Sequence, residues 1–350
     1  MTPTPNRAAP GATATRDALP TPAAPTMQAV VQRGYGTTDV LHLERVARPE
    51  PAEGQVLVRV QAAGLDRGVW HLMAGLPYVV RPMFGMSTPK QPIPGLDVAG
   101  TVEAVGAGVD TLAVGDRVFG TAPGAFAEYA VTDAARLARI PEGVDTEAAA
   151  SLAVSGVTAL EAVRVRAGVR AGHRVLVLGA SGGVGGYAVQ IAAAAGAEVT
   201  GVASAAKAEL VRSWGATRVI DYATTDVTTL PERYDAIIDI NGRLPLGRLS
   251  RLLTPRGRLV IVGGEGGNRL TGGIERQFAA RLRSAFTRRT LGFFISSDSG
   301  QWLPELAELV ASGAVRPTAG DVYPLADVRR TIDDLVAGRV RGKAVLHVTE

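Results

Sequence analysis

Residues 174–186 read Arg174-Val-Leu-Val-Leu178-Gly179-Ala-Ser-Gly182-Gly183-Val184-Gly185-Gly186, an apolar run followed by a glycine loop. The run Arg174–Leu178 predicts a buried strand, and the small residues of Val184–Ala195 predict a helix that ends at Gly196. Glycines let the backbone come close to a diphosphate, and a helix N-terminus offers free N–H groups. This context favours dinucleotide binding over the alternative, a glycine turn that serves only close helix packing.

Downstream of the loop, predicted strands alternate with predicted helices. This alternation requires crossover connections and is typical of a parallel sheet in an α/β fold. The expected strands are Glu198–Ala203, Arg218–Asp221, Tyr234–Ile240, Arg258–Val262 and Leu291–Ser296, and the expected helices are Ala205–Trp214 and Pro245–Leu253.

Upstream of the loop, short strands are separated by glycine and proline turns, which predicts a compact β-barrel-like domain. A helical region follows over Glu147–Val165, with Thr146 as its expected N-cap. Near the end of the chain, helices at Gln301–Ser312 and Asp327–Ala337 and a strand at Ala344–Val348 are expected to pack back onto the first domain. The expected upstream strands are Met27–Gln32, Leu41–Val46, Gln55–Ala62, Gly100–Val105, Asp116–Phe119 and Phe126–Val131, with one helix at Arg67–Ala74.

The composition is that of a folded protein with more than one domain. The chain has 350 residues, of which 46% are apolar and 20% are charged, so global disorder is excluded. The formal net charge of +4 is small for this length and does not suggest a nucleic-acid-binding protein. The absence of cysteine excludes disulfides, iron–sulfur clusters and thiolate zinc sites. No apolar run reaches about 18 residues, so we expect no membrane span.

Residues 1–26 are rich in Pro, Ala and Thr and predict a disordered tail. They hold no continuous apolar stretch, so we expect no secretory signal. An organellar presequence stays open because Arg7 and Arg16 are present, although Asp17 and the prolines weaken it. The simpler interpretation is an extension, or a start codon assigned upstream of Met27, on a cytoplasmic protein.

The end of the second strand of the βαβ unit indicates which cofactor is bound. It reads Val202-Ala-Ser204-Ala-Ala-Lys207 and contains no acidic residue. An acid there would bond the ribose 2′-OH of NAD, whereas Ser204 and Lys207 can donate to a 2′-phosphate. The pattern therefore favours NADPH, and the alternative is a surface helix N-cap followed by a solvated lysine.

Motifs from Met27 to Glu350 carry a family resemblance. They are Ala62–Gly64, Trp70–Met73, Pro94–Gly100, Val105-Gly106, Gly115–Phe119, Gly124–Tyr129, Gly179–Gly186, Asp221-Tyr222 and Arg341–Lys343. On these motifs the sequence resembles the zinc-free branch of the medium-chain dehydrogenase/reductase superfamily, and within it the quinone oxidoreductase-like and reticulon-interacting-protein-like members. The resemblance implies a Rossmann doubly wound parallel sheet plus a GroES-like β-barrel domain. It implies a tail over 1–26, a GroES-like catalytic domain over 27–150, a Rossmann NADP-binding domain over 151–290, and a return segment over 291–350 that completes the catalytic domain.

The resemblance also implies which residues bind the cofactor. The glycine loop would hold the phosphates, and the ends of the next two strands would hold the 2′-phosphate. Asn241 would contact the ribose side, and two later glycine segments would lie at or over the nicotinamide. Arg339 stands where relatives carry histidine, and Asp66 stands where many carry asparagine. The implied cofactor-binding residues are Gly179, Ala180, Ser181, Gly182, Gly183, Val184, Ser204, Lys207, Tyr222, Asn241, Gly263, Gly264, Gly292, Phe293, Phe294, Arg339, Val340 and Arg341.

Zinc ligands are not expected. Zinc-dependent relatives carry a cysteine at the position of Asp66, a histidine near Leu96 and a further cysteine after the long β region, where this chain offers Ser155 or nothing. A tetrahedral site needs three or four convergent ligands. The four histidines, His42, His71, His173 and His347, are scattered along the chain. We therefore expect no metal.

Without a Lewis acid, hydride transfer to an activated double bond in an enone or quinone is easier than to a plain ketone. His71, within Trp70–Met73, is the expected proton donor, and the alternative is a histidine that only caps or packs in its helix. Tyr78 is the second candidate donor, with a packed loop residue as the alternative, and solvent could donate in place of either. The alternative functions are a zinc-free alcohol dehydrogenase or carbonyl reductase, and a non-catalytic NADPH-binding sensor.

The expected partner is a small-molecule substrate, namely an enone, a quinone or a carbonyl compound. The resemblance also implies a homodimer. The basic segment Arg276–Arg289 would suit a membrane surface or a nucleic acid, but it has few aromatic residues and no base-reading motif. We expect a solvated helix beside the cleft there.

Overall fold

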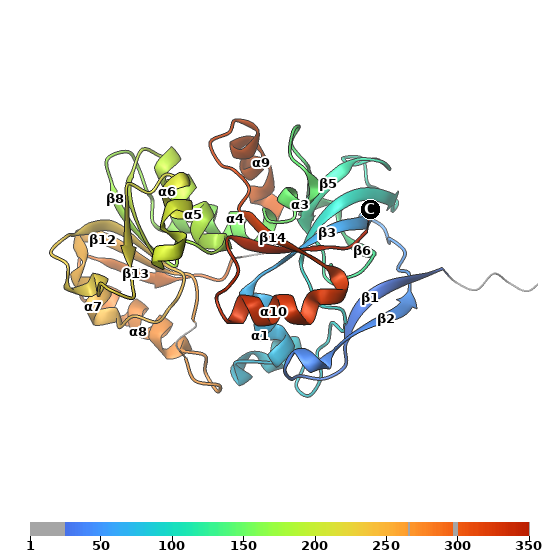
Figure 1. Ribbon diagram of the computed structural model, residues 1–350, viewed down its shortest axis with the longest axis horizontal. Helices are drawn as coiled ribbons and strands as arrows, with labels where there is room; N and C mark the ends of the chain where they lie inside the picture. The colour runs from blue at the N-terminus through green and yellow to red at the C-terminus, as the bar shows by residue number, and fades with distance from the viewer. Residues whose placement is uncertain (1–24, 265–266, 297–299, 350) are drawn as a thin grey trace, which may run out of the picture.

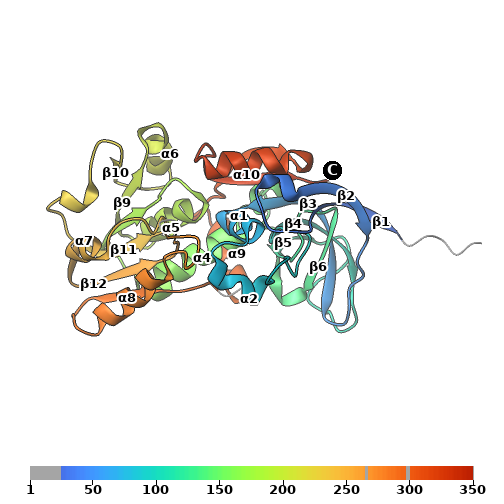
Figure 2. The same cartoon turned by 90° about the horizontal axis from the view of Figure 1, so that it is seen from below.

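The computed structural model describes residues 25–264, 267–296 and 300–349, and it contains two lobes that lie side by side (Figures 1 and 2). One lobe holds a six-stranded sheet flanked by helices. The other holds a seven-stranded antiparallel-rich sheet and a separate two-stranded sheet. The C-terminal segment, red in Figure 1, runs alongside the blue N-terminal strands, so both ends of the described chain belong to the second lobe.

The six-stranded sheet has the order β10-β9-β8-β11-β12-β13, and every neighbouring pair is parallel. The predicted doubly wound parallel sheet is therefore confirmed. The strand order reverses between β8 and β11, and ligands bind outside the carboxyl ends of the strands at such a switch point. The strands are β8 (Arg174–Leu178), β9 (Glu198–Ala203), β10 (Arg218–Asp221), β11 (Tyr234–Asp239), β12 (Leu253–Ile261) and β13 (Thr290–Phe293).

Helices cover both faces of this sheet (Figure 2). The helix after the glycine loop is hydrophobic almost all round, because it is covered on both sides. The helices of the lobe are α4 (Ala153–Leu160), α5 (Gly183–Ala194), α6 (Ala208–Ser213), α7 (Leu246–Arg251) and α8 (Ile274–Ser284), with 3-10 turns at Ala205–Lys207 and Val227–Thr229. Helix α9 (Leu303–Ala311), which follows a 3-10 turn at Gly300–Trp302, packs against both α4 and β7 between the lobes.

The second lobe contains a sheet of order β14-β15-β3-β4-β5-β7, with β6 paired to β3. The C-terminal β15 is antiparallel to β3, with Ala344 opposite Leu65. The strands are β1 (Thr26–Gln32), β2 (Leu41–Ala47), β3 (Gln55–Leu65), β4 (Asp97–Val105), β5 (Arg117–Thr121), β6 (Tyr129–Asp133), β7 (Leu137–Arg139), β14 (Ala319–Pro324) and β15 (Lys343–His347); the helices are α1 (Arg67–Ala74), α2 (Arg81–Phe84), α3 (Thr146–Ala149) and α10 (Val328–Val336), with 3-10 turns at Thr38–Val40, Tyr78–Val80, Ala134–Arg136 and Leu325–Asp327.

The helical region expected over Glu147–Val165 is present but interrupted, and only its expected N-cap is wrong. The chain forms α3, a turn, α4 and then a π-helical turn over Glu161–Arg166. Thr146 is not the N-cap, because the Asp145 carboxylate accepts the Ala148 N–H at 2.6 Å. The Asp97 carboxylate accepts the Val154 N–H at 2.7 Å. The carboxylate of Asp97, in β4, thus satisfies a backbone N–H at the start of α4. No local pattern in the sequence indicates this contact.

Two of the expected domain boundaries differ from the limits of the elements in the structure. The boundary at 290/291 falls inside β13, which pairs with β12. Most of the expected tail, residues 1–24, lies outside the described residues, whereas Thr26 already pairs with Ala47 in β1. The edge strand β14 was not predicted, because its alternation is interrupted by a glycine and its side chains are largely exposed.

A buried ion pair joins the C-terminal strand to the rest of the chain. The Lys343 ammonium contacts the Asp97 carboxylate, and the two residues are 2% and 0% exposed. Burial raises the pKa of Asp97 to about 6, although Lys343 opposes the rise. Burial would lower the pKa of Lys343, but the charges of Asp97 and Asp66 outweigh it and raise that pKa.

This pair makes a prediction about stability and pH. A carboxyl group with a raised pKa in the folded state binds its proton more tightly than the unfolded chain does, so stability falls as pH rises from the unfolded value of 3.8 towards 6. Between pH 4.5 and 7, the free energy of unfolding of the wild type should fall by about 2 kcal/mol more than that of Asp97→Asn. Urea unfolding at both pH values measures this, and a substitution penalty that grows with pH would contradict it.

Candidate functional site

The glycine loop lies at the carboxyl end of β8, and close packing fixes two of its glycines. Gly179 has φ of +86°, and a Cβ there would lie 2.6 Å from the side-chain oxygen of Asn241. A Cβ on Gly185 would lie 2.1 Å from the Gly179 carbonyl oxygen. Ala180, between them, is completely buried. The loop therefore folds back on itself and brings Asn241 against its first residue.

The start of α5 is open, as a diphosphate site requires. Gly182 is the N-cap residue and supplies no side chain to the helix N–H groups. A Cβ on Gly182 would meet only the Gly179 carbonyl oxygen, at 3.8 Å. The Ser181 carbonyl accepts the Gly342 N–H at 3.2 Å, so the C-terminal segment braces the loop from the side. The residues present thus fit an anionic dinucleotide, with the helix dipole pointing at its phosphates.

The residues expected at the 2′-phosphate come together, but Lys207 is not a solvated lysine. Its ammonium donates to the carbonyls of Gly338 at 2.9 Å and Val340 at 2.6 Å. Burial, and then the nearby charge of Arg341, lowers the pKa of Lys207. Arg341 is exposed and lines a small cavity of about 240 Å³ together with Lys207. Arg341 is therefore the more accessible cation at this corner.

The other residues expected around the adenosine are placed differently. Ser204 follows β9 directly, and its side chain caps no helix. Tyr222 follows β10 beside it and is 63% exposed, so both are accessible at the sheet edge. The Arg339 guanidinium is instead bound to the Asp334 carboxylate at 2.7 Å. The structure therefore does not bring Arg339 into this group.

The residues expected near the nicotinamide lie at the carboxyl ends of the next strands. Asn241 follows β11, and the segment with Gly263 and Gly264 follows β12. Gly292 has open space where a Cβ would stand, which leaves room for a ligand. Phe293 packs edge-on to Phe278 with ring centroids 6.1 Å apart, and Phe294 is buried under the Arg166 guanidinium. The ring of Phe294 is thus buried, and that of Phe293 is half-buried against the exposed Phe278.

The two expected proton donors lie near one another in the chain but in different surroundings. His71 is in the last turn of α1, with its ring 4.8 Å from that of Trp70 in an edge-on contact. Tyr78 is 40% exposed, and its N–H donates to the Arg269 carbonyl of the other lobe at 2.9 Å. Its ring lies between the guanidiniums of Arg81 and Arg269, at 4.6 and 5.9 Å. Tyr78 is therefore at the junction between the lobes.

Sequence reasoning missed a polar cluster beneath the glycine loop. The Lys343 ammonium, besides contacting Asp97, lies 3.4 Å from the Asp66 carboxylate and 3.1 Å from the Ser155 hydroxyl. A Cβ on Gly183 would lie 2.9 Å from that hydroxyl and 3.2 Å from Lys343 Cδ. Asp66 also caps α1 by accepting the Gly68 N–H at 2.8 Å. Two of the family motifs contain Asp97 and Lys343, but nothing in the sequence pairs them.

Within residues 25–264, 267–296 and 300–349, no three His, Asp or Glu side chains cluster in a way that could hold a metal ion. Asp66 and Ser155, at two positions where zinc ligands were looked for, lie beside the Lys343 ammonium. No helix in the described part of the chain is long and apolar enough to cross a membrane.

Known proteins resemble this chain over nearly its whole length. The GroES-like domain of alcohol dehydrogenases matches residues 52–142, and the zinc-binding dehydrogenase model matches residues 214–346. A human quinone oxidoreductase is 31% identical over 91% of this chain and 97% of its own. An NADPH-dependent alkenal/one oxidoreductase from Arabidopsis thaliana is 31% identical over 92% of this chain and 79% of its own. A mycobacterial protein solved with NADPH has a TM-score of 0.77, 27% identity and coverage of 92% and 99%.

The fold and the site define a two-lobed oxidoreductase with a dinucleotide-binding sheet and a GroES-like partner domain. The chain belongs to the medium-chain dehydrogenase/reductase superfamily, in its quinone oxidoreductase-like branch. The family resemblance of the sequence is thereby confirmed.

The open N-terminus of α5 makes a prediction that separates binding from folding. In Gly182→Asp, the carboxylate would accept the free N–H groups of α5, and stability would stay within a few tenths of a kcal/mol. The same carboxylate would occupy the diphosphate position and repel it, so NADPH affinity should fall at least tenfold. Fluorescence titration measures this, with Gly182→Ala as the control that keeps affinity within a few-fold. Unchanged binding in the Asp variant would rule out this site.

Proposed function

We propose that the protein is a zinc-independent, NADPH-dependent reductase of an activated double bond, in an enone or a quinone. The observation that supports it most directly is the open α5 N-terminus at the switch point, with Ser204, Lys207 and Arg341 at the adenosine end and no acid following β9. The names of the relatives, a quinone oxidoreductase and an NADPH-dependent alkenal/one oxidoreductase, agree with it.

Zinc independence is supported by the charge at the corresponding position. Lys343 places an ammonium among Asp66, Asp97 and Ser155, and a second cation there would be repelled. The lysine also supplies hydrogen bonds that these side chains would otherwise lack. Metal binding would require Lys343 to leave a buried, paired position, which is costly.

NADPH, when bound, supplies a hydride. The glycine loop would hold the diphosphate, and the cluster of Lys343 with Asp66 and Asp97 holds that loop against α1 and β4. The substrate would enter beside Tyr78, where the two lobes meet. An enone would gain the hydride at its β-carbon and a proton at its α-carbon, so that its C=C bond becomes a C–C bond, and a quinone would gain a hydride and a proton to give the hydroquinone. Tyr78, His71 or solvent would donate the proton.

We also propose a domain division that follows the sheets. Residues 27–150 and 294–349 would form the GroES-like catalytic domain, and 151–293 the cofactor domain, because β13 pairs with β12 and β15 pairs with β3. The cytoplasmic location and the homodimer remain predictions.

Cofactor choice gives one test. Ser204→Asp would place an acid at the end of β9, where it can accept from a ribose 2′-OH and repel a 2′-phosphate. We expect NADPH affinity to fall about tenfold or more and NADH affinity to rise. Parallel calorimetric titrations measure both, with Ser204→Ala as the matched control. If the Asp variant still prefers NADPH, Ser204 is not at the 2′-phosphate.

Turnover gives the second test. NADPH oxidation should be fast with an enone or a quinone and slow with a simple aldehyde. Tyr78→Phe should lower kcat at least tenfold if the phenol donates the proton, and His71→Ala should do so if the imidazole does, with NADPH affinity retained in both. If kcat falls in neither variant, the proton donor is solvent. A preference for the aldehyde supports an alcohol dehydrogenase, and tight NADPH binding without turnover supports a sensor.

A further inference from the structure

Exposed apolar side chains gather beside Tyr78, where the two lobes meet. Four of them follow it in the loop 79–86, and Leu270 of the other lobe adjoins them, because its carbonyl accepts the Val79 N–H at 3.0 Å. A contiguous exposed apolar surface marks a site of contact with another molecule. We call this set the apolar rim, and its members are Val79 (48% exposed), Met83 (69%), Phe84 (42%), Met86 (66%) and Leu270 (64%).

The backbone of the apolar rim turns tightly at Gly85. The Tyr35 hydroxyl donates to the Gly85 carbonyl at 2.7 Å. Gly85 is buried with φ of +126°, and a Cβ there would lie 1.9 Å from the Thr88 carbonyl oxygen. The turn therefore requires glycine, and it leaves the two neighbours, Phe84 and Met86, with exposed side chains on a held backbone.

The apolar rim is bordered by cations. Residues 67–96 and 267–274 contain neither Asp nor Glu. Lys90 and Arg269 are exposed, and neither contacts a carboxylate among the described residues. Arg269 directly precedes one member of the rim, and the Lys90 N–H donates to the carbonyl of another, Phe84, at 2.8 Å. The surface thus combines apolar area with positive charge that nothing in its own segments neutralises.

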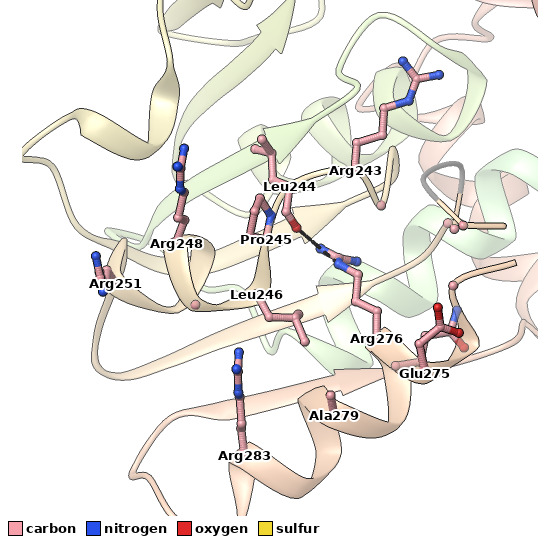
Figure 3. A pocket seen from close by; sticks show the side chains of 17 residues that line it. Arg243, Leu244, Pro245, Leu246, Arg248, Arg251, Glu275, Arg276, Ala279 and Arg283 are labelled. Atoms are coloured by element: carbon pink, nitrogen blue, oxygen red, sulfur yellow. Dashed lines mark hydrogen bonds between the residues drawn. The ribbon is translucent and has the colours of Figure 1, made fainter. Parts of the chain in front are cut away.

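The apolar rim lies at the outer edge of the junction between the lobes, where Figure 2 shows α2. It is separate from the cavity between α7 and α8, whose walls carry five arginines (Figure 3) and no residue of the rim. Tyr78, beside which the substrate would enter, directly precedes the rim in the chain. A molecule that covers the rim would therefore face the entrance to the candidate site.

We propose that the apolar rim docks the protein on an anionic lipid bilayer, with its apolar side chains in the interface and Lys90 and Arg269 at the headgroups. Apolar side chains gain free energy as they leave water for the acyl boundary, and each nearby cation adds attraction to anionic headgroups. The inference goes beyond the proposed function and does not rest on it. A docked protein would receive an apolar substrate, such as a quinone with a long tail, directly from the bilayer.

Two other occupants fit the rim less well. A second copy seated on the same surface about a two-fold axis would bring Lys90 and Arg269 against their own copies, with no acid in these segments to pair with them. An RNA needs aromatic rings for its bases to stack on, whereas four of the five rim side chains are not aromatic. A bilayer requires apolar area and a few cations, which the rim supplies.

Vesicle binding tests the inference with the full chain. The two probes are vesicles of phosphatidylcholine alone and vesicles in which about one third of the lipid is phosphatidylglycerol. We expect co-sedimentation to show at least tenfold tighter binding to the anionic vesicles. Salt at about 0.5 M should weaken that binding several-fold, because the Debye length shortens to a few ångströms.

Variants of the rim separate its apolar and charged parts. Met83→Ser/Met86→Ser should weaken binding to the anionic vesicles at least tenfold, because two apolar side chains no longer enter the interface. Lys90→Gln should weaken it about fivefold, because one cation is lost. The matched controls are Phe286→Ser, at an 81% exposed apolar residue outside the rim, and Arg288→Gln, at an exposed cation outside it, and both should bind as wild type.

Oxidation of methionine by dilute peroxide gives a readout that needs no variant. Met83 and Met86 are exposed, whereas Met27 and Met73 are only 2% and 1% exposed. Mass spectrometry should show sulfoxide formation at Met83 and Met86 in solution, and at least threefold slower formation on the anionic vesicles. The two buried methionines should stay reduced in both conditions, which reports that the protein remains folded.

The absence of binding to anionic vesicles, or equal binding of wild type and Met83→Ser/Met86→Ser, overturns the inference. An equal loss of binding in Phe286→Ser would assign the contact to the segment after α8 and overturn it as well. So would a dimer in light scattering that the double Met variant abolishes, or binding of an RNA oligonucleotide tighter than that of vesicles.

None of these measurements needs turnover, so the inference and the proposed function fail separately. A protein that binds anionic vesicles through the rim but oxidises no NADPH with an enone or a quinone keeps the inference and loses the proposed function. A protein that reduces these substrates but ignores vesicles loses only the inference.

Discussion

The ion pair of Lys343 with Asp97 is the contact on which both the fold and the site depend. It joins the last strand of the chain, β15, to the start of β4 in the interior of the protein. Breaking a buried pair by removing one partner is far more costly than never having built it, because the remaining charge stays without compensation. The same carboxylate also holds the first turn of α4, which packs against α5. The Asp97 carboxylate therefore links Lys343 of the second lobe to α4 of the dinucleotide-binding lobe.

The cofactor site is consequently built from distant parts of the chain. Gly183 leaves room for Ser155 and the Lys343 stem beneath the loop, and Gly342 donates to the Ser181 carbonyl at its side. Lys207 binds carbonyls just upstream, at Gly338 and Val340. The C-terminal segment thus touches the loop and the 2′-phosphate corner together. Both contacts place residues of the C-terminal segment beside the candidate cofactor site.

The sequence predicted well what is decided locally. The predicted bounds of the strand Arg174–Leu178 and of the helix after the glycines differ from the observed bounds by one residue at most. This is because the apolar run, the glycines and the small residues each determine the structure of positions close to them in the sequence. The break in the helical region expected over 147–165 could not be predicted, because the N–H of Val154 at the start of α4 donates to the carboxylate of Asp97, which is distant in the sequence. Lys207 follows β9, but its partners could not be predicted, because the backbone carbonyls of a distant segment leave no trace in the composition. The pairing of Lys343 with Asp97 could not be predicted either, because the two residues are far apart in the sequence.

The cations discussed above fall into two groups, those paired with a buried carboxylate and those that are exposed without a carboxylate partner in the described residues. Cations of the interior, Lys343 and Arg276, each have a buried carboxylate partner, so they contribute no net field to a ligand. Arg341, Arg251 and Arg283 are exposed and pair with no carboxylate in the described ranges. Arg341 lies at the corner beside Lys207, and Arg251 and Arg283 line a cavity between α7 and α8. Because exposed cations that lie together repel one another, such an arrangement is tolerated where anionic groups arrive to neutralise it. At the corner beside Lys207, the anionic group that the proposed function supplies is the 2′-phosphate of NADPH.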